Sequence, residues 1–237
     1  MNTRKFLSFI ILCLSWLPLA ADRYEDYVAA YADMAVAEMH RSGVPASITL
    51  SQGLLESAAG ASTLASEGNN HFGIKCHNDW QGETMLRDDD ALGECFRVYP
   101  SAADSFADHS RFLQRRRYAP LFELDPTDYA GWAHGLKSCG YATDPNYALR
   151  LIAIIERYGL YRYDHGAEEA AALDAEYIAS RLRSRHAISR SAGRYFVIAW
   201  PGDTYESIAA ELNLNPEALA AANDNCEITD WIEIYLK

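Results

Sequence analysis

Apolar side chains recur at helical spacing through the first third of the chain. The first run of such positions is Tyr24, Tyr27, Val28, Tyr31, Ala35 and Met39. In a second run Leu50 and Leu54 are four positions apart, which places both on one face of a helix. Pro45 suits the first turn of this second helix, and Gly60 suits its exit. The pattern therefore predicts two amphipathic helices joined by a short turn.

Glu56 lies on another side of the second helix, in line with Thr49 and Gln52. Most glutamates on amphipathic helices are solvated surface groups. Here, however, the carboxyl group is expected in the last turn, where the helix end is electronegative, and beside the apolar Leu55. Both influences favour the protonated form, which is the form that a general acid needs.

The middle of the chain predicts a hairpin followed by more helices. Residues 80–99 have the pattern of two strands around an acidic turn at residues 88–90. Further helices are predicted to begin at Ser101, Asp125 and Asp144. Gly140 and Gly159 suit the ends of the last two. Residues 22–165 thus predict a mostly helical α+β domain with a small β-hairpin lobe.

The C-terminal part of the chain changes in composition. Residues 166–193 are rich in Ala, Glu, Arg and Ser, with few large apolar side chains, and predict a linker with partial helix. The last segment, residues 194–237, begins with a strand-like run at residues 195–198 and closes with another at residues 231–236. Two short helices are predicted between these strands, so this segment predicts a small β-α-α-β domain.

The N-terminus has the composition of an export signal. Two basic residues precede an apolar run from Phe6 to Leu19, and two alanines follow it. The run is shorter than the roughly 20 residues that span a membrane. Residues 1–21 therefore predict a cleaved signal peptide, with no stable membrane anchor afterwards. We expect export to the periplasm, the cell envelope or the extracellular space.

Charge and cysteines narrow the possible partners. The chain has 33 Asp and Glu against 21 Lys and Arg, which argues against nucleic acid as a partner. Export permits disulfides, and Cys76 and Cys95 flank the predicted hairpin, which makes them the favoured pair. His71 and His77 lie near Cys76 without any spacing typical of zinc sites. We expect no metal and no cofactor.

Four segments of the predicted helical domain resemble motifs of the glucosaminidase family of peptidoglycan hydrolases, the flagellar and autolysin type endo-β-N-acetylglucosaminidases. They are residues 51–57 (SQGLLES), 69–75 (NNHFGIK), 96–99 (FRVY) and 141–145 (YATDP). The resemblance implies a lysozyme-like fold. It also implies hydrolysis of the β-1,4 bond between N-acetylglucosamine and N-acetylmuramic acid, with peptidoglycan glycan strands as the partner.

The C-terminal segment resembles a LysM module. The resemblance rests on Pro-Gly-Asp-Thr at residues 201–204 and on residues 207–209, and it implies glycan binding. The closing Pro-Gly-Gln turn that is usual in such modules is replaced by residues 228–231.

The first resemblance implies roles for individual residues. Glu56 would be the catalytic acid, and Tyr147 would orient water or the acetamido group beside the reacting sugar. The second carboxylate of the family lies on the hairpin, which makes Asp89 and Asp90 the candidates here. Alternatives for it are Asp88, Glu83 and Glu94. Candidate substrate-binding residues are Asn69, Asn70, Lys75, Trp80 and Tyr141.

Some of these features have simpler explanations. An Asn pair before Phe-Gly also makes a good turn, and many tryptophans serve in packing. The chain has Ala58-Ala59-Gly60 where the family commonly has Trp-Gly after the Glu-Ser pair, so one aromatic side chain is missing near the cleft. Two other functions stay open: a lytic transglycosylase on the same fold, and a wall-binding protein without catalysis.

Overall fold

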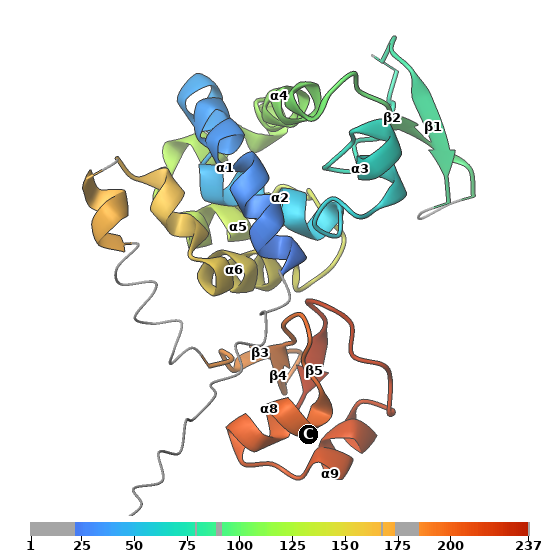
Figure 1. Cartoon of the computed structure of the whole chain (residues 1–237), viewed down its shortest axis with the longest axis vertical. Helices are drawn as coiled ribbons and strands as arrows, with labels where there is room; N and C mark the ends of the chain where they lie inside the picture. Colours follow the sequence, from blue (N-terminus) through green and yellow to red (C-terminus); the bar gives the residue numbers. More distant parts are fainter. Residues whose placement is uncertain (1–21, 79, 89–91, 167, 174–184, 237) are drawn as a thin grey trace, which may run out of the picture.

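The chain folds into two units that pack against each other (Figure 1). The computed structural model describes residues 22–78, 80–88, 92–166, 168–173 and 185–236. The predicted signal peptide lies outside these residues. No helix in the described part of the chain is long and apolar enough to cross a membrane.

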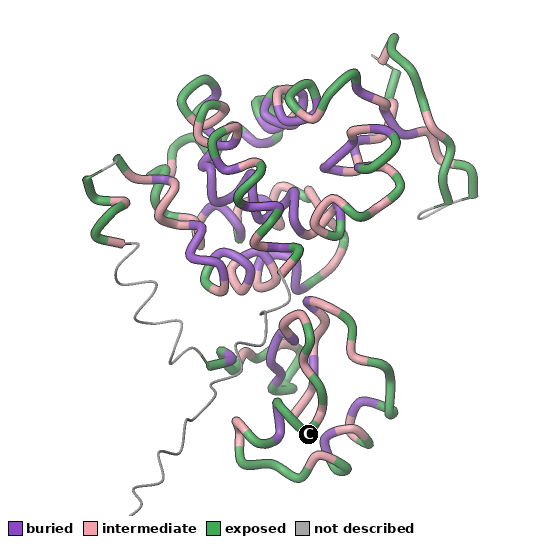
Figure 2. Tube along the Cα trace, in the orientation of Figure 1, coloured by how far each residue is buried: buried purple, intermediate pink, exposed green. Residues whose placement is uncertain are grey.

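The larger unit, the helical domain, is built around a central helix. Its helices are α1 (Arg23–Ser42), α2 (Ala46–Glu56), α3 (Thr63–Gly68), α4 (Ala102–Leu113), η1 (Arg116–Glu123), α5 (Tyr129–Ser138), α6 (Tyr147–Tyr158) and η2 (Leu160–Asp164). Residues 46–54 of α2 are all buried, and α2 contacts α1, α5, α6 and η2 (Figure 2). A helix buried on every side is a core helix, so its end marks where the core meets solvent.

Helix α2 ends at Glu56, earlier than the exit predicted at Gly60. The Ala59 N–H donates to the Leu54 carbonyl oxygen over 2.9 Å, and Ala58, Ala59 and Gly60 have φ of 50°, 55° and 80°. Non-glycine residues rarely adopt this left-handed conformation. The chain therefore turns sharply just after Glu56, which leaves the carboxyl group at the edge of the core.

Two later helices also begin differently from the prediction. Helix α5 starts after Asp128, whose side chain accepts from the Gly131 N–H, and not at Asp125. Helix α6 has Asn146 at its N-cap position, and Asp144 accepts from the Asn146 N–H over 2.9 Å, so Asp144 belongs to the preceding turn. The predicted cap at Ser101 is present, because its hydroxyl accepts from the Asp104 N–H.

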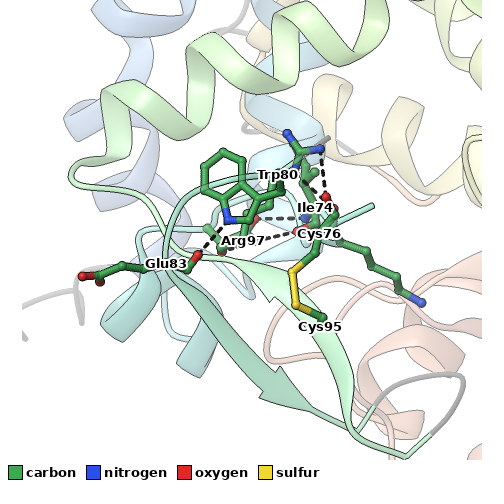
Figure 3. The surroundings of a disulfide bond; sticks show 8 residues. Ile74, Cys76, Trp80, Glu83, Cys95 and Arg97 are labelled. Carbon is green, nitrogen blue, oxygen red and sulfur yellow. Dashed lines mark hydrogen bonds between the residues drawn. A yellow bond between two sulfur atoms is a disulfide. The ribbon is translucent and has the colours of Figure 1, made fainter. Parts of the chain in front are cut away.

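The predicted hairpin forms a separate small lobe. Strands β1 (Thr84–Arg87) and β2 (Glu94–Arg97) are antiparallel. A disulfide joins Cys76 to Cys95, the pair favoured from the sequence, with an S–S distance of 2.04 Å (Figure 3). The disulfide ties β2 to the segment that follows α3. The hairpin tip, residues 89–91, lies outside the described residues.

The C-terminal unit, residues 186–236, contains a three-stranded antiparallel sheet. Its elements are β3 (Ser189–Ser191), β4 (Arg194–Ile198), α8 (Tyr205–Leu212), α9 (Pro216–Ala222) and β5 (Glu233–Tyr235), with strand order β3-β4-β5. The β-α-α-β order matches the prediction, but β3 was not predicted. Because β3 and the buried His186 belong to this unit, the boundary predicted at residue 194 is too late.

Candidate active site

Glu56 lies in a cleft of the helical domain, and its side chain is half-buried. The cleft consists of two adjoining pockets, both lined by Glu56, Lys75, Tyr141 and Ala142. The first, the aromatic side, is also lined by Phe72, His77, Phe112, Arg117 and Tyr118. The second, the polar side, is also lined by Thr143, Asp144, Tyr147 and Arg150. The cleft therefore has different chemistry on the two sides of Glu56.

A chain of hydrogen bonds runs from the core to the Glu56 carboxyl group. The Tyr147 hydroxyl donates to Glu56 Oε1 over 2.9 Å, and the Gln52 amide nitrogen donates to the Tyr147 oxygen over 2.9 Å. Gln52 Oε1 then faces His109 Nε2 at 2.9 Å. With the amide in this orientation Oε1 can only accept, so His109 carries its proton on Nε2. The donor and the acceptor of each hydrogen bond are thereby defined, from His109 through Gln52 and Tyr147 to Glu56.

Tyr147, Tyr141 and His109 stay neutral near Glu56. Desolvation, and then the nearby Glu56 charge, raise the pKa of Tyr147 well above its usual value, and the pKa of Tyr141 shifts the same way. Burial lowers the pKa of His109 to about 3. Tyr147 is therefore a fixed neutral donor. Because Glu56 Oε1 accepts its hydrogen bond, an acidic proton of this carboxyl group is better placed on Oε2.

The structure leaves the second carboxylate open. Asp89 and Asp90 lie outside the described residues, and Asp88 accepts from the Gly93 N–H over 2.8 Å at the base of the turn. Glu94 pairs with Lys75 Nζ, with both carboxyl oxygens at 2.9 Å. The positive charge of Lys75 makes the Glu94 carboxylate a poorer proton acceptor. Glu94 is therefore a weaker candidate for the base than Asp89 or Asp90.

The Asn70 side chain is used within the fold. It is 1% exposed, donates to the carbonyl oxygens of Ile74 and Arg97, and accepts from the Ile74 N–H. The simpler explanation, a structural turn, holds for this residue. Asn69 caps α3 with φ of 49° and donates to the Tyr99 carbonyl oxygen, so its amide group also serves the loop.

Trp80, a predicted substrate-binding residue, does not line either pocket of the cleft. The Arg97 guanidinium stacks 4.8 Å from its ring centre, and its indole N–H donates to the Glu83 carbonyl oxygen over 2.8 Å (Figure 3). It lines a separate pocket with Glu83 and Tyr99, so the alternative carboxylate Glu83 lies there too. Lys75 and Tyr141 do line the cleft.

Sequence reasoning missed residues that line the cleft and residues of the hydrogen-bond chain buried behind it. Gln52 was noticed only for sharing a helix face with Glu56, and that spacing is the signal that could have linked them. His109 reads as a lone core histidine, and it is fully buried. Arg117 and Arg150 line the two sides of the cleft, and neither has a sequence signal of its own. Among the described side chains, no group of three or more His, Cys, Asp or Glu could hold a metal ion.

Comparison with known proteins identifies the family. The profile of the glucosaminidase family, described as mannosyl-glycoprotein endo-beta-N-acetylglucosaminidase, matches residues 32–160, more than half of the chain. The chain belongs to the glucosaminidase family. The matched segment contains Glu56, Tyr147 and the whole cleft, and the helical domain is accordingly a glycoside hydrolase domain.

Individual relatives also match part of this chain. Exo-glucosaminidase LytG of Bacillus subtilis is 37% identical over 130 residues, covering 50% of this chain and 45% of that protein. Peptidoglycan hydrolase FlgJ of Salmonella typhimurium is 32% identical over 153 residues, covering 59% of this chain and 48% of that protein. The match therefore spans less than half of either relative.

Solved structures confirm the predicted fold of the helical domain. The catalytic domain of the autolysin Auto from Listeria monocytogenes aligns with a TM-score of 0.52 and 25% identity, covering 62% of this chain and 91% of that domain. The glycoside hydrolase domain of Salmonella typhimurium FlgJ aligns with a TM-score of 0.50 and 27% identity, covering 68% of this chain and 99% of that domain. A mostly helical, lysozyme-like glucosaminidase domain is thus established.

Proposed function

We propose that the protein hydrolyses peptidoglycan at the β-1,4 bond between N-acetylglucosamine and N-acetylmuramic acid. The observation that carries the proposal is the Glu56 carboxyl group, held in the cleft by the Tyr147 hydroxyl at 2.9 Å. The family description names a mannosyl-glycoprotein, whereas matched relatives are named peptidoglycan hydrolases. Both descriptions fit an enzyme that acts beside N-acetylglucosamine, and the relatives favour peptidoglycan.

Glu56 acts as the general acid in this proposal. It donates a proton to the glycosidic oxygen while the bond from that oxygen to the anomeric carbon breaks, and positive charge builds on the sugar. A water molecule then adds to the anomeric carbon and gives up a proton. A hairpin-tip carboxylate, Asp89 or Asp90, activates that water or stabilises the charged sugar. Tyr147 keeps the acid oriented and can also meet the water or the acetamido group.

Replacing Glu56 by Gln tests the acid directly. The change is nearly isosteric and keeps an acceptor for Tyr147, so folding should persist. General acid catalysis is worth about 10²- to 10⁴-fold, and we expect turnover of purified peptidoglycan to fall by at least about 100-fold. Thermal unfolding of both proteins serves as the folding control. Turnover within about tenfold of wild type would rule out Glu56 as the acid.

A lytic transglycosylase remains the alternative for the same cleft, because that reaction needs only one acidic residue. It would leave a 1,6-anhydro-muramic end, whereas hydrolysis leaves a reducing end. Mass spectrometry of the digestion products separates the two. Anhydro ends as the main product would replace hydrolysis with the transglycosylase reaction.

The terminal segments complete the proposal. We propose that residues 1–21 direct export, since the substrate lies in the cell envelope, and that the C-terminal unit is a LysM module that binds glycan. The Thr204 capping box and the β-α-α-β order of that unit support the second point. Co-sedimentation with insoluble peptidoglycan should fall when the whole unit, residues 186–237, is deleted. Secretion assays with and without residues 1–21 test the first point.

A further inference from the structure

Arg150 connects the cleft to the C-terminal unit. It comes from α6 and lines the polar side of the cleft with Glu56 and Tyr147. Its Nε and Nη2 atoms lie 3.1 and 3.0 Å from Glu233 Oε1, and Glu233 belongs to β5. Its Nε also lies 3.2 Å from Asp144 Oδ2. A residue of the second unit therefore holds a side chain in the wall of the cleft.

The C-terminal unit is fixed where it meets the helical domain. Trp231 is 2% exposed, and its ring packs edge-on against Tyr24 and Tyr158 at 5.6 and 6.0 Å. Asp230 accepts from the Tyr24 hydroxyl over 2.8 Å and from Arg23 over 2.6 Å. Both residues stand in the segment that replaces the usual Pro-Gly-Gln turn. The departure from the LysM pattern thus makes an internal interface, and the buried Trp231 ring is the part of it that can hold Glu233 in place.

The charges at Arg150 determine which ligand it can bind. One guanidinium faces two carboxylates, from Asp144 and Glu233, and the three side chains are 25%, 28% and 15% exposed. The cluster carries a net charge of about −1 if all three groups are ionised, so it would repel a carboxylate of a peptide stem. The Nη1 group of Arg150 makes no hydrogen bond to any described residue. Its two N–H groups suit a neutral acceptor.

We propose that Arg150 contacts the substrate, donating from Nη1 to a hydroxyl or acetamido oxygen of a sugar, and that Glu233 is the positioning residue that holds it there. This inference rests on the proposed function of the cleft. It assigns the C-terminal unit a part in substrate binding at the cleft itself. Without Glu233 the long Arg150 side chain regains rotamer freedom, which weakens binding. The bond-breaking step, at Glu56, should change little.

The test compares two interface carboxylates with soluble peptidoglycan glycan fragments as the substrate. Glu233→Ala removes the partner of Arg150, and Asp230→Ala removes a partner of Arg23 and Tyr24 that does not line the cleft. We expect Glu233→Ala to raise KM by about five- to tenfold with kcat within about twofold, and Asp230→Ala to leave KM unchanged. Arg150→Lys, which keeps the charge and loses the planar fork, should also raise KM.

A double mutant and a binding assay complete the test. Arg150→Ala with Glu233→Ala should raise KM no more than Arg150→Ala alone, because Glu233 acts through Arg150. An unchanged KM in Glu233→Ala, an equal rise in Asp230→Ala or additive effects in the double mutant would each overturn the inference. If wild type does not cleave peptidoglycan, the proposed function fails first. Fragment binding to the Glu56→Gln protein, with and without Glu233→Ala, then decides whether Arg150 holds sugar.

Discussion

Helix α2 and the β1–β2 hairpin, which carry the two proposed catalytic carboxylates, differ in how firmly the rest of the fold holds them. Helix α2 is buried along residues 46–54, and its Glu56 receives a hydrogen-bond chain from the core. The hairpin has short strands and exposed apolar side chains, with Leu86 63% and Leu92 88% exposed. One carboxylate is therefore positioned before substrate arrives, while its expected partner sits on a lobe that few buried contacts restrain.

Among the described residues, the most buried anchors of the hairpin lie at its base. Arg97 Nη1 lies 2.8 Å from Asp108 Oδ2 with both side chains nearly buried, and the Tyr99 hydroxyl donates to the same oxygen over 2.7 Å. The Cys76–Cys95 disulfide adds a covalent link. We propose a division of work in which α2 positions the acid and the hairpin carries the second carboxylate.

The largest effect is expected at the hairpin tip. Asp89→Asn combined with Asp90→Asn should lower kcat by about 10²-fold or more, close to the loss for Glu56→Gln, because the water or the charged sugar loses its carboxylate. The single variants then locate the residue. The Asp88→Asn variant is the control, since Asp88 accepts the Gly93 N–H in the turn. Activity within threefold of wild type in the double variant would move the second carboxylate elsewhere.

Removing the disulfide should have the next largest effect. Cys76→Ser with Cys95→Ser opens a loop with a sequence separation of 19, and such links typically contribute about 2 to 4 kcal/mol. We expect the hairpin to lose order, so hydrogen exchange should rise in residues 80–99 and little in α2. Cys139→Ser, which removes a free cysteine, is the control. An equal rise in hydrogen exchange in residues 80–99 and in α2 would show that the hairpin and the helix are not anchored independently.

The Tyr147→Phe variant tests whether the hydrogen bond from Tyr147 positions the acid at the end of α2. It removes the donor to Glu56 Oε1 and leaves the Gln52 amide nitrogen without its acceptor. We expect kcat to fall by about tenfold, and unfolding free energy to fall by about 1 to 3 kcal/mol. Tyr129→Phe removes a phenol that donates to Glu156 over 3.3 Å outside the cleft, and should leave kcat unchanged. An equal kcat in Tyr147→Phe would mean that the hydrogen bond does not orient the acid.

The sequence predicted the parts of the site that depend on local pattern. The helix that carries Glu56 follows from apolar spacing, and its role follows from the resemblance to a family that the comparisons then established. The end of α2 could not be predicted, because Ala58 and Ala59 carry no signal for the left-handed backbone that they adopt. Only tertiary packing imposes that conformation.

Long-range contacts explain the remaining errors. Trp80 was a candidate sugar platform, but the Arg97 guanidinium lies over its ring and Tyr99 makes an edge contact with it. The segment before residue 194 looked like linker because it lacks an apolar run, yet His186 is buried between Asp203 and Glu211. Nothing in the pattern around Trp231 indicates that it packs on another domain. Such contacts depend on partners far away in sequence, and periodicity does not encode them.

Acid should weaken the core before it weakens the base of the hairpin. Burial lowers the pKa of His71 to about 4 and of His109 to about 3, so their stabilising contribution is complete above about pH 6.5 and is lost as the pH falls. Burial raises the pKa of Asp164 to about 6, so the folded chain takes up a proton at Asp164 between about pH 6 and pH 4. This uptake stabilises the fold in acid and opposes the effect of the two histidines. Burial alone would raise the pKa of Asp108, but the Tyr99 hydrogen bond and the charges of Arg97 and Arg111 lower it. Asp108 therefore keeps stabilising the base of the hairpin to lower pH.

The two protons that the unfolded chain gains at these histidines outweigh the one that the fold gains at Asp164. The free energy of unfolding should therefore fall on acidification between about pH 6 and pH 4. Urea unfolding at four pH values across this range measures the slope. Hydrogen exchange in α2 would report the core, and hydrogen exchange at Arg97 and Tyr99 the base of the hairpin. If the free energy of unfolding stayed flat or rose on acidification, His71 or His109 would have to be charged in the folded protein. The assignment of a neutral His109 at the start of the hydrogen-bond chain to Glu56 would then be wrong.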